Sequence, residues 1–355
     1  MKSGKFFFSL VMISFGIISC KKDNVPNTTP PKTTTGVYSL NQGNYGSNNT
    51  TLTYYDFTKA SATTDFFKTV NGFGLGDTGS DFIIYGSKIY IVMNVSGNVA
   101  VADAVTAKYI DTISFTAGGT NKGPENIASY GGKVFVSSTD GTVSVIDTTT
   151  LAIEKSITVG ENPAQMIISG SNLYVSNTGG FSAQFDSTVS VIDLTTLTET
   201  RKITVGINPG CIAADNAGNI YVACTGDYST VAPSLVKVNT NNNTVTKSAD
   251  TAVGTVRYYN NNLFVTGGYL GIAYVRVLST TDFSAIKSNF ISDGTLITTP
   301  YALDIDPSTG DVYVGDSKDY VSSGEIFCFD KNGNKKFSFS TSPTASPVKT
   351  VLIQH

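Results

Sequence analysis

The sequence predicts an all-β protein, and specifically a seven-bladed β-propeller. Three observations lead to this prediction: strand-like segments recur at a regular interval, aromatic residues are frequent (18 Tyr and 20 Phe), and charged residues make up only 14% of the chain. Aromatic and β-branched residues favour strands, whereas Gly and Asn favour the turns between them. With few strong helix formers, this balance is typical of an extracellular β protein.

The repeat is clearest in one type of apolar segment, seen in "KIYIVMN", "KVFVSST" and "NLYVSNT". Its aromatic landmarks are spaced by 45, 39, 47, 43 and 49 residues, and they are Tyr90, Phe135, Tyr174, Tyr221, Phe264 and Tyr313. Another strand precedes each landmark, often opened by proline as in "PENIASY" and "PAQMIIS". Two more follow, as in "TVSVID" and "KSITVG". Four antiparallel strands in a repeat of this length are the sequence signature of a propeller blade.

Six complete units span residues 74 to 342, and short pieces remain at both ends. The N-terminal pieces are "GVYSLNQ", "TLTYYD" and "FFKTV", and the C-terminal piece is "PVKTVLI". We expect the C-terminal piece to form the innermost strand of a seventh blade and the N-terminal pieces to form its other three strands. This arrangement closes the ring and leaves no unpaired inner edge. The propeller domain is therefore assigned to residues 36–355.

The first residues predict export. Residues 1–19 carry lysines and then an apolar run from Phe6 to Ile18 that is too short to span a bilayer comfortably, which indicates a signal peptide. Its end, "IISC", resembles the bacterial lipobox, and this implies that Cys20 becomes the lipidated N-terminus. The alternative is an ordinary thiol after an uncleaved anchor. Residues 20–35 have the composition of a flexible tether, so we expect a surface-exposed outer-membrane lipoprotein of the cell envelope, held to the membrane only by its lipid.

Composition argues against several function classes. Lys plus Arg (24) nearly equal Asp plus Glu (27) without a basic block, so nucleic acid is not an expected partner. The single histidine is the last residue, His355, and no catalytic triad can be built from interior residues. The carboxylate pairs Asp77 with Asp81 and Asp304 with Asp306 could serve acid–base chemistry, but aspartates in turns are ordinary strand connectors. We predict a protein that is not an enzyme and has no cofactor.

The remaining cysteines lie in strand patterns and suggest no metal site. Cys211 and Cys224 flank the "DNAG" turn of a hairpin. Two alternatives stay open for them: buried thiols, or a disulfide formed after export.

Long loops with aromatic residues predict a binding face. The loops from the second to the third strand emerge on the same face as the connections between blades, because strand direction alternates. In five contiguous blades these loops are long, and each carries an aromatic residue: Tyr45, Phe181 with Phe185, Tyr228, Tyr269 and Tyr320. Exposed aromatic clusters rimmed by polar residues mark recognition surfaces. The alternative is that each ring only folds back on its own loop.

The mouth of the central channel opens on the same face. Alignment of the blades on their prolines places one residue from each innermost strand around it: Asp81, Asn126, Gln165, Cys211, Thr255, Ala302 and Lys349. A mostly polar ring of mixed charge suits a large neutral ligand with amide groups. The alternative is a set of polar groups that hold ordered water.

The segments "TVSVIDTTTLAIEKSITVGENPAQ" and "TVSVIDLTTLTETRKITVGINPG" resemble the YVTN repeat of surface-layer-type propellers. The opening "YSLNQGNYGSNNTTLTYYD", with "VNGFGLGD" and the lipobox, is similar to a narrower set of outer-membrane propeller lipoproteins. The best understood of these capture vitamin B12 and related corrinoids for a TonB-dependent transporter, so the resemblance implies a corrinoid ligand and such a transporter as partner. The other candidate function is a scaffold that docks a protein or glycan and has no small-molecule pocket.

Overall fold

The computed structural model describes residue 1 and residues 34–180, 182, 184–267, 273–342 and 346–354. The chain divides into two compact units, Met1–Thr33 and Thr34–His355. All the elements below belong to the second unit. The predicted signal peptide, the lipidated Cys20 and the tether up to residue 33 lie outside the described residues.

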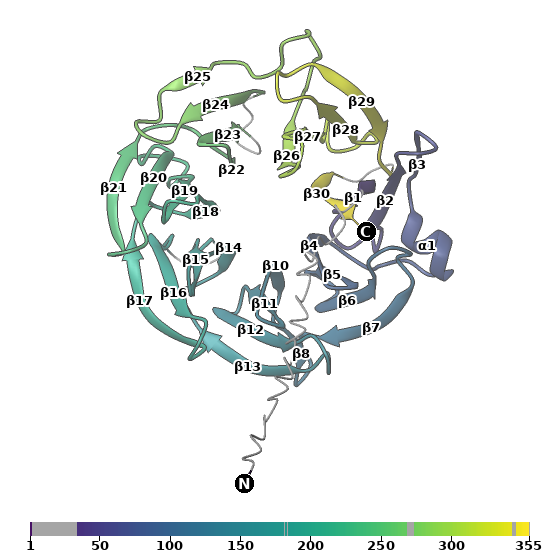
Figure 1. The fold of residues 1–355 in the computed structure, drawn as a ribbon, viewed down its shortest axis with the longest axis horizontal. Coiled ribbons are helices and arrows are strands. Elements are labelled where there is room, and N and C mark those ends of the chain that lie inside the picture. The colour runs from purple at the N-terminus through teal and green to yellow at the C-terminus, as the bar shows by residue number, and fades with distance from the viewer. Residues whose placement is uncertain (2–33, 181, 183, 268–272, 343–345, 355) are drawn as a thin grey trace. The chain divides into compact units, whose positions relative to one another are not determined.

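Seven four-stranded antiparallel sheets surround a central axis, as Figure 1 shows. The chain is therefore a seven-bladed β-propeller, as the sequence predicted. From the innermost strand outward, blade 2 contains β4 (Gly79–Tyr85), β5 (Lys88–Met93), β6 (Asn98–Asp103) and β7 (Tyr109–Ser114). Blade 3 contains β10 (Pro124–Tyr130), β11 (Lys133–Ser138), β12 (Thr142–Asp147) and β13 (Ile153–Thr158). Blade 4 contains β14 (Pro163–Ser169), β15 (Asn172–Asn177), β16 (Thr188–Asp193) and β17 (Thr198–Thr204).

The remaining complete repeats follow the same order. Blade 5 contains β18 (Pro209–Ala214), β19 (Asn219–Cys224), β20 (Ser234–Asn239) and β21 (Thr244–Ala249). Blade 6 contains β22 (Thr255–Tyr259), β23 (Asn262–Thr266), β24 (Val275–Ser279) and β25 (Ala285–Lys287). Blade 7 contains β26 (Pro300–Ile305), β27 (Val312–Asp316), β28 (Glu325–Phe329) and β29 (Lys335–Ser340). A small hairpin of β8 (Thr116–Ala117) and β9 (Thr120–Asn121) lies in the connection between blades 2 and 3.

Burial explains why each strand has its sequence. The second strand of a blade is packed on both faces, and its aromatic landmark is at most 6% exposed in all six repeats. The outermost strands are mostly exposed and correspondingly polar, as in β13 and β17. Several innermost strands begin with proline, which is tolerated as the first residue of a strand because no ladder hydrogen bond is lost there.

Blade 1 closes the ring with strands from both ends of the chain. Its order is β3 (Ser61–Thr63), β2 (Thr51–Asp56), β1 (Thr34–Asn41) and β30 (Pro347–Gln354), with β30 innermost and antiparallel to β1. The predicted closure is therefore confirmed.

One predicted strand of this blade is wrong, because "FFKTV" forms the helix α1 (Phe66–Asn71) and β3 is the third N-terminal strand. The Asp65 carboxylate accepts a hydrogen bond from the Lys68 N–H, and Gly72 ends the helix in the left-handed conformation at φ 79°. Phe67 anchors the helix and is 1% exposed.

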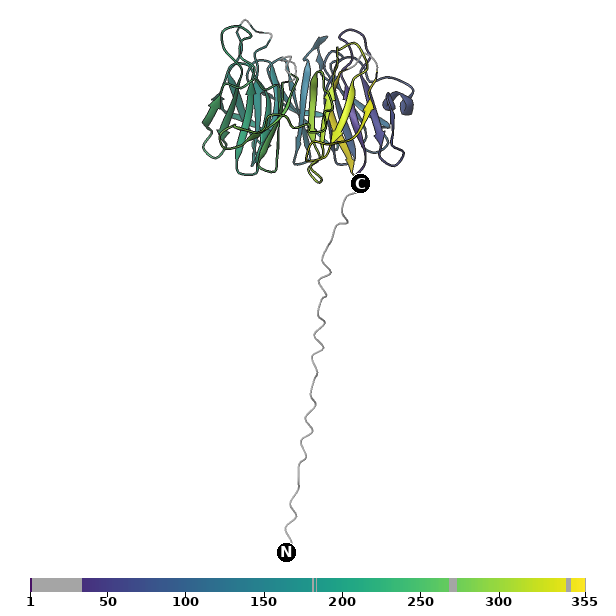
Figure 2. The ribbon, with the colours of Figure 1, turned by 90° about the horizontal axis from the view of Figure 1, so that it is seen from above.

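Two faces result from the alternation of strand direction. We call the face that carries the second-to-third loops and the blade connections the long-loop face. These two sets of loops contact each other: the Asn208 N–H donates to Asp186 O and the Gln42 N–H donates to Ser346 O, both at 2.8 Å. Figure 2 shows the propeller edge-on, with its larger loops on the upper side. No helix within the described residues has the length and apolar character needed to cross a membrane.

Candidate functional site

Four of the predicted loop aromatics fall within the described residues. Tyr45 is 84% exposed and makes no ring contact with another described residue, Tyr228 is 65% exposed, and Tyr320 is 47% exposed. Phe185 packs edge-on against Tyr228 of the next blade, with ring centroids 5.7 Å apart. Phe181 and Tyr269 lie outside the described residues. Aromatic side chains from the loops of blades 1, 4, 5 and 7 are therefore accessible on the long-loop face.

Two of these rings are held by neighbours. Tyr320 packs edge-on against Tyr301 of β26 at 6.0 Å, and the Tyr228 hydroxyl lies 3.4 Å from the Asn208 amide nitrogen. Tyr228 and Tyr320 also have positive φ, at 59° and 62°, so their loops are tightly turned at the aromatic residue itself. These rings both stabilise their loops and remain partly open to a ligand.

Below this face, the channel contains two adjoining cavities. The upper one has a volume of about 250 Å³ and is lined by Gln42, Glu125, Thr255, Cys211 and Tyr301, among others. The next one has a volume of about 290 Å³ and is lined by Asp81, Asp304 and Lys349, together with apolar side chains. Asn126, Gln165 and Arg257 line both cavities. The structure thus places Asp81, Asn126, Gln165 and Lys349 around the channel.

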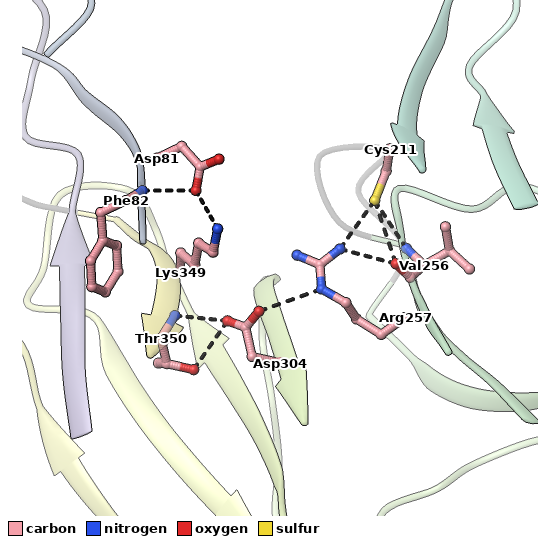
Figure 3. Close-up of polar contacts among 8 residues, drawn as sticks. All are labelled: Asp81, Phe82, Cys211, Val256, Arg257, Asp304, Lys349 and Thr350. Carbon is pink, nitrogen blue, oxygen red and sulfur yellow. Dashed lines mark hydrogen bonds and ion pairs between the residues drawn. The ribbon is translucent and has the colours of Figure 1, made fainter. Parts of the chain in front are cut away.

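Charged residues on four of the inner strands form two ion pairs between neighbouring blades, inside the channel (Figure 3). The Lys349 ammonium on β30 donates to the Asp81 carboxylate on β4 at 2.6 Å. The Arg257 Nε on β22 donates to the Asp304 carboxylate on β26 at 3.4 Å. Asp304 also accepts hydrogen bonds from the Thr350 N–H at 2.7 Å and from the Thr350 hydroxyl at 3.0 Å.

The contacts continue to the neighbouring blades. The Arg257 Nη1 group donates to the Cys211 sulfur at 3.4 Å and to Val256 O at 3.0 Å. At the other end, Asp81 accepts the Ile127 N–H of β10 at 3.1 Å. We call the residues Cys211, Arg257, Asp304, Thr350, Lys349 and Asp81 the channel belt. The belt links blades 5, 6, 7, 1, 2 and 3, so much of the channel polarity serves to hold the ring together.

Burial raises the pKa of two carboxyl groups, that of Glu125 beside the belt and that of Asp304 within it. Burial, reinforced by the negative charge of Asp81, raises the pKa of Glu125 to about 7. Glu125 accepts a hydrogen bond from the Asn94 amide at 2.7 Å. Burial also raises the pKa of Asp304, although Arg257 and Lys349 oppose this shift.

Several polar groups around the cavities have hydrogen-bonding capacity that the described residues do not use. The side-chain amides of Asn126, Gln165 and Gln42 and the hydroxyl of Tyr301 line the cavities without a hydrogen bond to another described residue. The Ser80 hydroxyl is buried beside both cavities and also has no partner. These groups can accept or donate hydrogen bonds to whatever fills the channel, whether water or a ligand.

Other predicted residues have different positions or roles. Ala302 does not line either cavity: it is 2% exposed and pairs with Gly315, because the bulge in β26 turns Tyr301 into the mouth instead. Asp306 holds a turn by accepting hydrogen bonds from Ser308 and Thr309. Asp304 belongs to the channel belt, so the two aspartates do not form a carboxylate pair for acid–base chemistry.

Cys211 and Cys224 are free thiols, so the disulfide alternative is wrong. The Cys211 sulfur instead contacts the Val256 N–H at 3.3 Å and Arg257. Burial raises the pKa of Cys224 to about 12, as expected of an inert core thiol.

The sequence analysis missed Arg257, Glu125 and Tyr301. It assigned only one residue of each innermost strand to the channel mouth, and these three are at other positions of their strands. A usable signal was present: only three arginines occur in the chain, and Arg257 is in an innermost strand. It also missed two exposed aliphatic residues in the same loops as Tyr228 and Tyr320, namely Val231 and Val321 at 44% and 68% exposure.

The comparison with known families decides what the chain is related to. A family model described as a domain of unknown function (DUF5074) matches residues 35–323. The chain belongs to this family. The match covers most of the propeller, including Asp81, Arg257 and Asp304 of the channel belt, and it ends before Lys349 and Thr350. Among curated proteins, none matches the sequence.

Solved structures similar to this DUF5074 chain support its fold. Hydrazine synthase of Kuenenia stuttgartiensis is 17% identical with a TM-score of 0.60, over 72% of this chain and 77% of that chain. A quinonprotein alcohol dehydrogenase-like protein from Bacteroides thetaiotaomicron VPI-5482 is 15% identical with a TM-score of 0.63, over 90% and 79%. The computationally designed protein Ika8 is 12% identical with a TM-score of 0.58, over 90% and 91%. At these identities the likeness concerns the fold alone.

Proposed function

We propose that this protein is a non-enzymatic ligand-binding lipoprotein of the cell envelope. Its long-loop face and channel mouth bind a large small molecule, by resemblance a corrinoid such as vitamin B12, for delivery to a TonB-dependent transporter. The support is physical: accessible aromatic rings beside a polar cavity offer both apolar contact and hydrogen bonds to one ligand.

The observation that carries the proposal is the loop of residues 42–50. Tyr45 is the most exposed described side chain among the predicted aromatics, at 84%, and no other described aromatic ring packs against it. Gln42, from the same loop, lines the upper cavity. This loop therefore joins the aromatic surface to the channel mouth, and a ligand lying on it can contact both.

The cavity volumes define how such a ligand would bind. The two channel cavities, at about 250 and 290 Å³, are at the lower end of the ~300–1,000 Å³ range of small-molecule sites. A corrinoid macrocycle would therefore lie on the loops, and only a polar side arm would enter the channel. The amides of Asn126, Gln165 and Gln42, which make no hydrogen bond to another described residue, are the groups that such an arm would meet.

The test is titration of the full-length chain with cyanocobalamin and cobinamide, followed by calorimetry and by the visible spectrum of the corrinoid. Saturable one-to-one binding is the expected result. A folded protein that gives neither heat nor a spectral change would rule out the corrinoid.

The second candidate function is a scaffold that docks a protein or glycan. The exposed aliphatic residues Val231 and Val321 favour it, because they extend the apolar part of the long-loop face beyond the channel mouth. Saturable corrinoid binding that depends on channel residues such as Gln165 would disfavour the scaffold. Binding of a macromolecule that is insensitive to those residues would favour it.

The lipid anchor has a separate test. In a bacterial host, Cys20→Ser should abolish incorporation of labelled palmitate and move the protein out of the membrane fraction. Cys328→Ser is the matched control, because Cys328 is a buried free thiol of the propeller. Equal labelling of both variants would contradict the lipobox interpretation.

A further inference from the structure

We propose that Arg257 forms an oxyanion-binding site in the channel, where it receives a carboxylate or phosphate group of the ligand. The inference deepens the proposed function, since this group would belong to the side arm that enters the channel. It rests on a comparison of how completely the two cations of the channel belt are paired.

Lys349 is closely paired with one carboxylate. Its ammonium lies 2.6 Å from the Asp81 carboxylate, and Asp81 is itself fixed by the N–H groups of Phe82 at 2.8 Å and Ile127 at 3.1 Å. A short contact to a carboxylate held in place from two strands leaves this cation little attraction for another anion.

Arg257 is only partly engaged. Its single carboxylate contact is the 3.4 Å approach of Nε to Asp304, and its Nη1 donates to a backbone carbonyl and a thiol. The Nη2 group makes no hydrogen bond within the described residues. In Figure 3 it carries no dashed line and points toward the side of the channel where Lys349 lies. A guanidinium normally binds a carboxylate through two parallel N–H bonds, and this one has donors left for such a partner.

Asp304 is not oriented to accept two parallel hydrogen bonds from the Arg257 guanidinium. Its other oxygen is held by the N–H and hydroxyl of Thr350, at 2.7 and 3.0 Å. The carboxylate is thereby oriented toward β30, and only one edge faces Arg257. An incompletely paired arginine in a confined channel is costly, because its lost hydration is not fully replaced. An incoming oxyanion would supply the missing acceptors.

Arg257 is also the most accessible belt residue from within the channel. It lines both cavities described above and a third of about 330 Å³ toward the opposite face. The amides of Asn126 and Gln165 line the first two of these cavities, so they can donate to the same oxyanion.

The test measures binding of sodium acetate and inorganic phosphate to the full-length chain by calorimetry and thermal melting, against sodium chloride at equal ionic strength. We expect saturable binding of at least one oxyanion that weakens tenfold or more in Arg257→Gln. Arg257→Lys should also weaken it, because an ammonium cannot form two parallel bonds. Arg201→Gln removes the same group from the exposed outer strand β17 and should leave binding unchanged.

Asp304→Asn should change the oxyanion affinity in the opposite direction. It removes the charge that competes for Arg257, while its amide oxygen can still accept from Thr350, so oxyanion binding should strengthen about threefold. Loss of folding cannot produce opposite effects in the two variants. Preference for acetate identifies a carboxylate, and preference for phosphate identifies a phosphate group.

The proposal would be overturned if sodium chloride gave the same binding signal as the oxyanions. It would also be overturned if Arg257→Gln and Arg201→Gln had the same oxyanion affinity. Oxyanion binding without corrinoid binding would keep the channel site and reject the corrinoid. Corrinoid binding without oxyanion binding would reject only the site on Arg257.

Discussion

At the scale of single residues, the loop aromatics differ in how much of each ring the protein itself uses. Phe185 and Tyr228 pack on each other, and Tyr320 packs on Tyr301. Tyr45 is 84% exposed and has no ring partner in the part of the chain that the structure describes. Its loop is instead held through backbone and Asn contacts, such as the Asn44 N–H donating to Asn49 at 2.8 Å. The tyrosine is thus free for a ligand, whereas its loop does not depend on it.

Tyr45→Ala should therefore weaken ligand binding without loss of stability. We expect about a tenfold weaker affinity for the bound corrinoid, which corresponds to roughly 1.4 kcal/mol and is typical of one aromatic contact, with an unchanged melting temperature. Tyr130→Ala is the control, because Tyr130 is 46% exposed on the opposite face at the end of β10. Equal effects of the two substitutions on calorimetric affinity would remove Tyr45 from the site.

Glu125 makes stability depend on pH. Its pKa is about 7 in the folded protein against an ordinary 4.5, so the folded state binds the proton more tightly than the unfolded state. The contribution of Glu125 to the stability is therefore most favourable below pH 4.5 and is lost as the pH rises through 7. Glu125→Gln, which cannot ionise, should be more stable than the natural protein at pH 8, by about 1–3 kcal/mol, and similar to it at pH 4.

The measurement is urea unfolding at both pH values. Glu154→Gln is the control, because that carboxylate is paired with Lys133 near the surface. The same stability difference for Glu125→Gln at pH 4 and pH 8 would contradict the assignment.

At the scale of elements, each blade is held by the second strand, whose aromatic side chain fills the space between neighbouring sheets. Phe135 of β11 is 1% exposed and packs with Val143, Leu173 and Val175 of blades 3 and 4. The outer strand of the same blade contributes much less, since Ile153 of β13 remains 38% exposed.

Phe135→Ala should destabilise the protein by about 3–5 kcal/mol, because it removes a fully buried ring and leaves a cavity. Ile153→Ala should cost less than about 1 kcal/mol. Chemical denaturation followed by circular dichroism measures both. Similar losses would mean that the outer strands carry more of the blade stability than burial indicates.

At the scale of the whole molecule, the ring depends on closure by β30. This strand pairs with β1 from Thr34↔Gln354 to Asn41↔Pro347 and carries the ion pair from Lys349 to Asp81 of the next blade. A chain that ends at Ser346 lacks the innermost strand of blade 1 and exposes the inner edge of β1.

We expect this truncated chain to lose its cooperative unfolding transition and to aggregate, as judged by calorimetry and size-exclusion chromatography. Lys349→Ala keeps the strand and removes only the ion pair, so it should still unfold cooperatively. A truncated chain with a native-like transition would show that closure by β30 is dispensable.

The sequence by itself determined the blade repeat, the number of blades and the closure by both ends, because burial on both sides of a strand imposes an apolar pattern that recurs visibly. It also located Asp81, Asn126, Gln165 and Lys349 at the channel, since the blade repeat fixes where each inner strand starts and proline marks that start in the strands of Asn126, Gln165 and Lys349. The helix α1 was not predicted, because "FFKTV" is as apolar as a strand and only its caps Asp65 and Gly72 distinguish it.

Only the tertiary structure decided how the channel residues combine. Arg257, Asp304 and Lys349 come from three blades, and Asp81 lies 268 residues from its partner Lys349. Ion pairs between sequentially distant strands depend on distances and orientations of a few ångströms, which no local pattern encodes. The same reason explains why the accessible edge of Arg257 became visible only in the folded ring.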